Sequence, residues 1–339
     1  MTLPYRYARR KSDMQIVIGI DIGGTTTKLG AVTQQGEMLF KTTFSTCAHA
    51  NEESYLQELK QKVNEVLKVA GNNAVMGIGA GAPMANYFTG SIKGTANLSW
   101  RKEVNLKSFL EESFQIPTVI TNDANLAAIG EKHFGQAKDF NSFVSIIIGT
   151  GLGSGIFLNN QLLHGKYDLV GELGHTSVKR NGRVCGCGKY GCLETYVSAN
   201  GLRRTFFKLM ADQDLPSTLR QVSYDQVTPE LIHEAAKAGD PIARLTFEYT
   251  GDVLGMKIAD FIITFEPEAI FLSGGLASAG ELLLKPTREA VNRYLLKDYP
   301  EVKVLLSKLR SDEISILGGA ALAWDYYQAE FMNQNVKSI

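Results

Sequence analysis

The chain has 339 residues, 44% of them hydrophobic, a length that predicts two domains with one core each. Lysine plus arginine and aspartate plus glutamate both number 35, so the formal net charge is zero, which argues against a nucleic-acid-binding protein with a broad basic face. The sequence contains no uninterrupted run of about 18 apolar residues, so no transmembrane helix is expected. The basic residues 1–15 lack the apolar region of a signal peptide. We therefore expect a cytoplasmic protein with no membrane partner and a solvated N-terminal tail over residues 1–15.

Hydrophobic patterning predicts strands and helices that alternate along much of the chain, as is typical of the α/β class. Short apolar runs rich in β-branched residues indicate strands, and apolar residues at helical spacing indicate helices. In chain order we expect a strand at 16–20, two strand-like pieces within 29–44, a helix at 52–70, strands at 75–78 and 119–121, a helix at 124–131, strands at 143–148 and 269–273, a helix at 281–297, a strand at 302–306 and a helix at 316–332.

A glycine- and threonine-rich turn follows the first predicted strand, in the sequence Asp21-Ile22-Gly23-Gly24-Thr25-Thr26-Thr27-Lys28. Glycines let a phosphate approach the backbone closely, and the N–H groups of a tight turn favour an anion. Threonine hydroxyls add donors, and Asp21 could hold magnesium through a water molecule. The spacing is not that of a P-loop, and a hairpin turn without a ligand would explain the same residues.

A second turn of this kind, Gly149-Thr150-Gly151-Leu152-Gly153, follows the predicted strand at 143–148. Residues 146–160 thereby repeat the pattern of residues 18–32: a buried strand, a turn of glycine and threonine, and another strand. This echo suggests a duplicated β-hairpin whose two turns offer backbone N–H groups to one ligand. A third glycine turn, Gly274-Gly275, follows the predicted strand at 269–273.

Four potential metal ligands lie within 18 positions, with the spacing H-x9-C-x-C-x4-C: His175, Cys185, Cys187 and Cys192. Zinc prefers tetrahedral coordination by thiolate and imidazole, and a closed set of three cysteines and one histidine is a structural site. The intervening glycines supply the sharp turns that such a loop needs. Unrelated buried cysteines are the alternative interpretation, and the spacing favours zinc over it.

Two neighbouring segments, Gly171-Glu172-Leu173-Gly174-His175 and Cys185 to Glu194, resemble the signature of the ROK family (repressors, open reading frames, kinases). The resemblance extends from about residue 16 to 332 and includes both phosphate turns, the pair Asn122-Asp123 and the turn Gly274-Gly275. It implies a two-domain, ribonuclease-H-like fold of the actin and hexokinase type (ASKHA) with a zinc-binding loop. The implied α/β domains are residues 16–122, onto which helix 316–332 packs back, and residues 123–315, which contain the zinc motif.

The resemblance also implies the role of each motif. Asp123 would be the catalytic base, although aspartate at a strand-to-helix junction could also be a simple N-cap. The hexose would bind to Asn97, Asn122, Asp123, Glu172, His175 and Glu194. ATP with Mg²⁺ would bind between the domains, through Asp21, Gly23, Gly24, Thr25, Thr26, Lys28, Gly149, Thr150, Gly151, Gly153, Gly274 and Gly275. Zn²⁺ would be held by His175, Cys185, Cys187 and Cys192, leaving one nitrogen of His175 for the sugar.

The activity expected from the resemblance is ATP-dependent phosphorylation of a hexose at its terminal hydroxyl, with glucose as the first choice. Kinases of N-acetylmannosamine or N-acetylglucosamine are the alternative, and the family implies a homodimer. A sugar-responsive transcriptional regulator of the same family would carry a helix-turn-helix domain of roughly 60 residues before the first turn. Only 15 residues precede the first predicted strand, so we expect a kinase that binds no nucleic acid. A sugar-binding protein without catalysis is disfavoured because Asp21, Asp123 and both turns are present.

Overall fold

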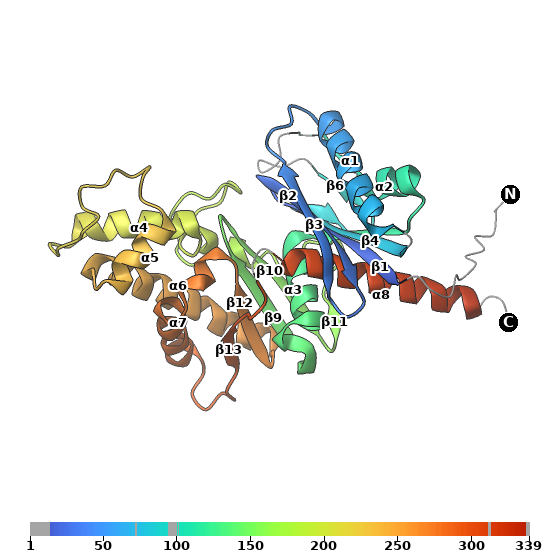
Figure 1. The fold of residues 1–339 in the computed structure, drawn as a ribbon. Helices are drawn as coiled ribbons and strands as arrows, with labels where there is room; N and C mark the ends of the chain where they lie inside the picture. Colours follow the sequence, from blue (N-terminus) through green and yellow to red (C-terminus); the bar gives the residue numbers. More distant parts are fainter. Residues whose placement is uncertain (1–13, 72, 94–99, 101, 311–312, 337–339) are drawn as a thin grey trace. The chain divides into compact units, whose positions relative to one another are not determined.

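The computed structural model describes residues 14–71, 73–93, 100, 102–310 and 313–336 (Figure 1). The chain divides into two compact units, one formed by residues 1–122 together with 316–339 and the other by residues 123–315. Asn97 and all but the last two residues of the expected tail lie outside the described residues. Each unit is built on its own five-stranded sheet.

The first unit contains a sheet with the strand order β3-β2-β1-β4-β8. Its first three strands form antiparallel pairs, and β4 and β8 extend the sheet in parallel with β1. The strands are β1 (Gln15–Ile22), β2 (Thr26–Thr33), β3 (Met38–Ser45), β4 (Ala74–Ala82) and β8 (Thr118–Asn122).

Helices cover both faces of this sheet because side chains alternate along each strand. Ile16, Ile18 and Ile20 of β1 point to one face and share a buried core with α1 (Glu52–Ala70) and α2 (Leu106–Phe114). Gly19 points to the opposite face, where a Cβ atom would overlap the carbonyl oxygen of Ile316. The helix α8 (Ile314–Val336) therefore lies directly on the sheet of the first unit.

The second unit repeats this arrangement, with the strand order β11-β10-β9-β12-β13. The antiparallel hairpin β9–β10 corresponds to β1–β2, and β12 and β13 extend the sheet in parallel with β9. The duplicated β-hairpin predicted from the echo between residues 18–32 and 146–160 is thus confirmed. The strands are β9 (Phe143–Ile148), β10 (Leu152–Leu158), β11 (Gln161–Leu162), β12 (Ala269–Ser273) and β13 (Lys303–Leu306).

Most helices of the second unit lie on one face of its sheet. Ile146 and Ile148 of β9 share the largest buried core with Leu254 and Ile258 of α6. On the other face, Gly153 and Gly155 of β10 face α3, where Cβ atoms would crowd alanine side chains. The helices are α3 (Asp123–Phe134), α4 (Ala199–Asp212), α5 (Pro229–Lys237), α6 (Pro241–Phe265) and α7 (Glu281–Tyr294).

Short elements occupy the connections. Three two-residue strands, β5 (Ala85–Asn86), β6 (Ser91–Ile92) and β7 (Val104–Asn105), form a small sheet in the first unit. Single turns of 3₁₀ helix occur at η1 (Gln136–Asp139), η2 (Leu173–His175), η3 (Leu193–Thr195) and η4 (Gly275–Ala279). None of the helices within the described ranges is long and apolar enough to span a membrane.

Candidate active site

The first phosphate-type turn joins β1 to β2 in the first unit. Gly23 N–H donates to Thr26 O at 3.0 Å, which closes the turn, and Asp21 and Lys28 face each other across the hairpin. Lys28 Nζ lies 3.8 Å from Asp21 Oδ2. Burial raises the pKa of the Asp21 carboxyl, and the positive charge of Lys28 partly offsets this effect. A second cation beside Asp21 would favour its ionised form further, which suits the magnesium role predicted for it.

The threonines of this turn divide into two environments. Thr25 is exposed, whereas Thr27 is fully buried. The hydroxyl of Thr27 lies 2.7 Å from Thr46 Oγ1 and 3.0 Å from the hydroxyl of Tyr55, whose pKa burial raises. Thr27 therefore fixes the hairpin to α1 and to Thr46, the residue that follows β3, whereas the exposed Thr25 and the half-buried Thr26 are the threonines that can meet a ligand.

Two predicted site residues share one edge of the first sheet. In the parallel pairings, Asp21 of β1 is opposite Gly81 of β4, and Ala82 of β4 is opposite Asn122 of β8. The carboxyl ends of these three strands thus meet at the same edge, where open α/β sheets bind their ligands. Asn122 is the last residue of this unit, and Asp123 begins the second.

The second turn joins β9 to β10 in the second unit. Gly149 N–H donates to Gly151 O at 2.9 Å, and Gly149 O accepts from Ala199 N–H at the start of α4 at 2.8 Å. Gly274 follows the parallel strand β12 with a φ of 89°, and a Cβ atom there would lie 2.5 Å from Ile148 O. The second and third glycine turns are therefore neighbours at one sheet edge.

Close packing explains why glycine occupies position 153, independently of the nucleotide contact predicted for this residue. It lies within β10, and a Cβ atom at this position would lie 2.8 Å from the Cβ of Ala124. The glycine thereby lets the first turn of α3 approach the strand. Asp123 opens this helix, is half-buried, and its Oδ1 accepts from Ala124 N–H at 2.9 Å. The orientation of Asp123 thus depends on the close packing of α3 against β10.

The four predicted metal ligands come together in the second unit. The ligand atoms of His175, Cys185, Cys187 and Cys192 all lie within 4.8 Å of one another. Cys187 Sγ and Cys192 Sγ are 3.7 Å apart, and Cys185 Sγ is 3.6 Å from His175 Nδ1. Zinc binds with bonds of about 2.3 Å to sulfur and about 2.0 Å to nitrogen. In a tetrahedral site, two ligand sulfur atoms are then about 3.8 Å apart, and a sulfur and a nitrogen are about 3.5 Å apart. The cluster therefore fits a zinc ion.

The thiols of this cluster have different environments. Burial raises the pKa of Cys185 and raises the pKa of Cys192 to about 12. At Cys187 burial acts in the same direction, but a hydrogen bond from the backbone of Lys189 and hydrogen bonds with the Cys185 and Cys192 thiols outweigh it and lower the pKa. Backbone turns hold the loop: Cys185 N–H donates to Lys189 O at 2.9 Å, and Gly191, with a φ of 74°, packs against the carbonyl of Lys179.

The loop that carries Glu172 and His175 lies on the backbone of β10. Gly171 has a φ of 96°, and a Cβ atom there would lie 2.5 Å from Ser154 O. The Ser154 hydroxyl donates to the carbonyl of Gly171. His175 Nε2 lies 3.8 Å from Glu172 Oε2, while its Nδ1 faces the cysteines. One ring nitrogen is thus directed to the metal cluster and the other to a half-exposed carboxylate.

Glu194 connects the metal cluster to the second turn. Its Oε2 accepts from Leu152 N–H at 3.0 Å, directly after Gly151, and its Oε1 lies 3.8 Å from Cys185 Sγ. A Cβ atom on Gly151 would lie 2.5 Å from the same carboxylate. A single carboxylate therefore contacts both the phosphate-type turn and the predicted zinc ligands.

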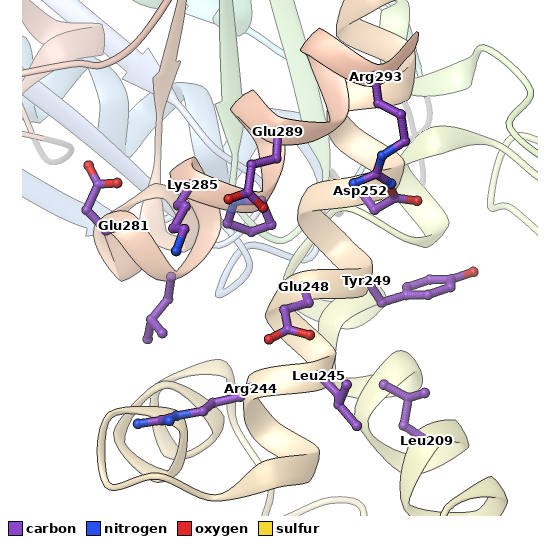
Figure 2. A pocket seen from close by; sticks show the side chains of 12 residues that line it. Leu209, Arg244, Leu245, Glu248, Tyr249, Asp252, Glu281, Lys285, Glu289 and Arg293 are labelled. Atoms are coloured by element: carbon purple, nitrogen blue, oxygen red, sulfur yellow. The ribbon is translucent and has the colours of Figure 1, made fainter.

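A separate cavity of about 650 Å³ lies among α4, α6 and α7 in the second unit (Figure 2). Acidic and basic side chains of α6 and α7 line it, and Arg293 Nη1 pairs with Asp252 Oδ1 at 2.7 Å. None of the predicted site residues contributes to its lining. The cavity is therefore distinct from the candidate active site.

The chain belongs to the ROK family, whose model matches residues 17–326. This confirms the family expected from the motifs. A glucokinase from Halalkalibacterium halodurans is 32% identical over 316 residues, which cover 90% of this chain and 94% of that protein. A xylose repressor from Caldicellulosiruptor bescii is 30% identical over 91% of this chain and 78% of its own length.

A solved structure confirms the α/β fold class. A ROK family glucokinase from Streptomyces griseus, crystallised with glucose and AMPPNP, superposes with a TM-score of 0.78 at 31% identity. The match covers 91% of this chain and 99% of that chain. The present chain therefore has the mixed α/β fold of the ROK sugar kinases.

Proposed function

We propose that this protein is an ATP-dependent hexose kinase that phosphorylates the terminal hydroxyl of its sugar. The contact of Glu194 with both Leu152 N–H and the metal cluster carries the proposal, because a carboxylate predicted to bind sugar lies next to a turn predicted to bind phosphate. The family relationship and the glucokinase relatives support the same activity.

The sugar site would combine carboxylates with an oriented imidazole. Glu172 and Glu194 can each accept hydrogen bonds from vicinal hydroxyls, and His175 Nε2 can contact a third. The cluster fits zinc, which would be held by His175 with the three cysteines and would fix the tautomer of the ring when bound. Asn122 and Asn97 are the further predicted contacts of the sugar.

Asp123 would act as the general base. It would orient the terminal hydroxyl and accept its proton as the oxygen–phosphorus bond forms and the bond between the γ-phosphorus and the β,γ-bridging oxygen breaks, so that ADP leaves. The glycine turns at 23–25 and 149–151 would bind the phosphates through backbone N–H groups other than those of Gly23 and Gly149, which close the turns, and the turn at 274–275 would lie on the adenosine side. Asp21 offers the carboxylate that Mg²⁺ prefers beside phosphate oxygens.

We expect glucose to be the preferred sugar in a panel assay of purified protein with ATP. The glucokinase relatives favour glucose, because the predicted contacts at Glu172, His175 and Glu194 satisfy hydroxyls at one edge of the ring but do not by themselves exclude an acetamido group. The measurement is kcat/KM for glucose, N-acetylmannosamine, N-acetylglucosamine and other hexoses in a coupled assay of ADP release. A value for an acetamido sugar about tenfold above that for glucose would reassign the substrate.

The same assay tests a second candidate, a sugar-responsive regulator, which the relationship to a xylose repressor favours. A regulator would bind sugar, detectable by calorimetry, without releasing ADP from ATP. Turnover above the rate without sugar supports the kinase. Sugar binding with no turnover for any member of the panel would favour the regulator.

We expect about one zinc ion per chain in purified protein, and Cys187→Ser should remove most of it. Loss of zinc frees the ring of His175, so the KM for sugar should rise as well. The matched control is Cys47→Ser, since Cys47 is an exposed thiol outside the cluster, 3.4 Å from the hydroxyl of Ser45. Metal content is measured by plasma mass spectrometry. Active wild-type protein with less than about a tenth of an equivalent of zinc would contradict the assignment.

A further inference from the structure

Arg183 lies two residues before the predicted zinc ligand Cys185, and its guanidinium donates to two backbone carbonyls and one threonine hydroxyl. Nη1 donates to Thr195 O at 2.8 Å and to Gly201 O at 3.0 Å, and Nη2 donates to Thr205 Oγ1 at 2.9 Å. Burial lowers the pKa of Arg183, and the charge of Arg204 adds to this effect. Within the described part of the chain, no ion pair is found for Arg183, so its charge is balanced by carbonyl dipoles.

The contacts of Arg183 enclose the segment that carries Cys192 and Glu194. At one end of this segment, Gly191 N–H donates to Arg183 O at 2.8 Å. At the other end, the side chain of Arg183 binds the carbonyl of Thr195, the residue that follows Glu194. One residue thereby fixes both ends of the segment 191–195.

Tyr196 completes this support. Its hydroxyl accepts from Arg183 N–H at 3.1 Å, and the guanidinium carbon lies 4.4 Å from the centre of its ring. A planar guanidinium can stack on an aromatic ring and bind several carbonyls at once, whereas an ammonium group cannot reproduce this geometry. The position therefore requires arginine rather than a positive charge alone.

The same contacts extend to the second phosphate-type turn. Gly201 and Thr205 belong to α4, whose first residue, Ala199, donates its N–H to Gly149 O at 2.8 Å. Glu194 is held to this turn separately, through Leu152 N–H. Arg183 thus connects the helix that supports the turn to the segment that presents Glu194.

From this geometry we infer that Arg183 is a positioning residue for the sugar site, which holds Glu194 in place independently of the metal. The inference rests on the proposed function, because it assigns Glu194 to the sugar. Arg183 itself contacts neither the metal ligands' sulfur atoms nor the turn glycines through its side chain. Its effect passes through Thr195 to Glu194.

The test is Arg183→Gln in the full-length protein loaded with zinc. We expect the KM for sugar to rise about tenfold, the order expected for loss of a charge-assisted hydrogen bond, with kcat within about twofold of wild type. Zinc content should stay near the wild-type value, since all four ligands remain. Arg220→Gln is the matched control, because the guanidinium of Arg220 likewise makes three hydrogen bonds, all to backbone carbonyls, but at the far end of α4. It should leave the KM unchanged.

A double-mutant cycle with Glu194→Gln tests whether Arg183 affects sugar binding through Glu194. In the Glu194→Gln background, Arg183→Gln should change the KM by less than about twofold, because the carboxylate it positions is already gone. Full additivity, a fall in kcat without a change in KM, or loss of zinc in the single variant would each overturn the inference. Arg183→Lys, which keeps the charge but not the planar fork, should give the same rise in KM and replaces Arg183→Gln if that variant does not fold. Absence of turnover in wild-type protein would instead refute the proposed function. In that case, the sugar affinities of wild-type protein and Arg183→Gln, compared by calorimetry, would still test the positioning role of Arg183.

Discussion

Replacing Asp123 by asparagine should lower kcat by about 10²–10⁴-fold, the range typical for loss of a general base. Asparagine keeps the size of the side chain and an oxygen that can accept from Ala124 N–H, the hydrogen bond that holds Oδ1 at 2.9 Å. It cannot take the proton of the sugar hydroxyl. The affinity for ATP, measured by calorimetry, should therefore stay near that of the wild type while steady-state turnover collapses.

Asp139→Asn is the control for this substitution. Asp139 is exposed and lies in η1, just beyond the end of the helix that Asp123 opens, so the same change of charge is made on a neighbouring element. Its kcat should match the wild type. If Asp123→Asn weakened ATP binding as strongly as it lowered kcat, Asp123 would belong to the nucleotide site or to the fold, and its assignment as the base would be wrong.

The parts of the fold that could be predicted are those with a local signal. The bounds of α1, β9 and β12 agree with the predicted ranges 52–70, 143–148 and 269–273, because each is a continuous pattern with a clear end. Asn51, for example, caps α1 by accepting from Ser54 N–H at 2.9 Å. The repeated pattern of strand, turn and strand likewise predicted both hairpins, since the turn residues follow the strands directly.

Predictions were less accurate where packing overrides the local pattern. The helix expected at 281–297 ends at Tyr294, because Leu295 has an extended backbone and packs with Tyr299 against the core of the second unit. The loop after β4 contains the short strands β5 and β6, whose two-residue pairings leave no periodic signal. Tertiary contacts decide both features, and hydrophobic spacing does not report them.

The candidate site shows the same division. The metal cluster has a spacing signal, and the structure brings its four ligands together. The hydrogen bond from Leu152 N–H to Glu194 joins residues 42 positions apart, and the contact from Arg183 to Thr195 uses a backbone carbonyl. Neither interaction leaves a signal in the sequence, because one partner in each is a backbone group, and nearly every residue has the same backbone groups. Sequence therefore predicted the candidate ligands of the site, and only the fold identifies what holds them.

The other large effect concerns the packing of α8 on the first sheet, and Gly79→Ala should destabilise the protein by about 3 kcal/mol, near the upper end of the usual range for overpacking. A Cβ atom at Gly79 would overlap the carbonyl oxygen of Gly319 in α8, and a backbone atom cannot rotate away as a side chain can. No unusual φ is involved at this glycine, so the close approach of the helix alone requires it. The substitution should lower the Tm by roughly 6–12 °C, at about 2–4 °C per kcal/mol for a unit of this size.

Gly77→Ala provides a matched control, because Gly77 lies two residues earlier in β4 and faces the same helix. A Cβ atom there would lie 3.5 Å from the Cβ of Ala323, which is an ordinary van der Waals contact. Since alanine also restricts the unfolded chain, this variant should melt at or slightly above the wild-type temperature. Thermal melts followed by circular dichroism compare the two variants directly. Equal Tm values for the two variants would mean that α8 does not approach the sheet at Gly79 as closely as the structure places it. A much lower Tm for Gly79→Ala than for Gly77→Ala would show that the stability of the first unit depends on the contact between α8 and its sheet.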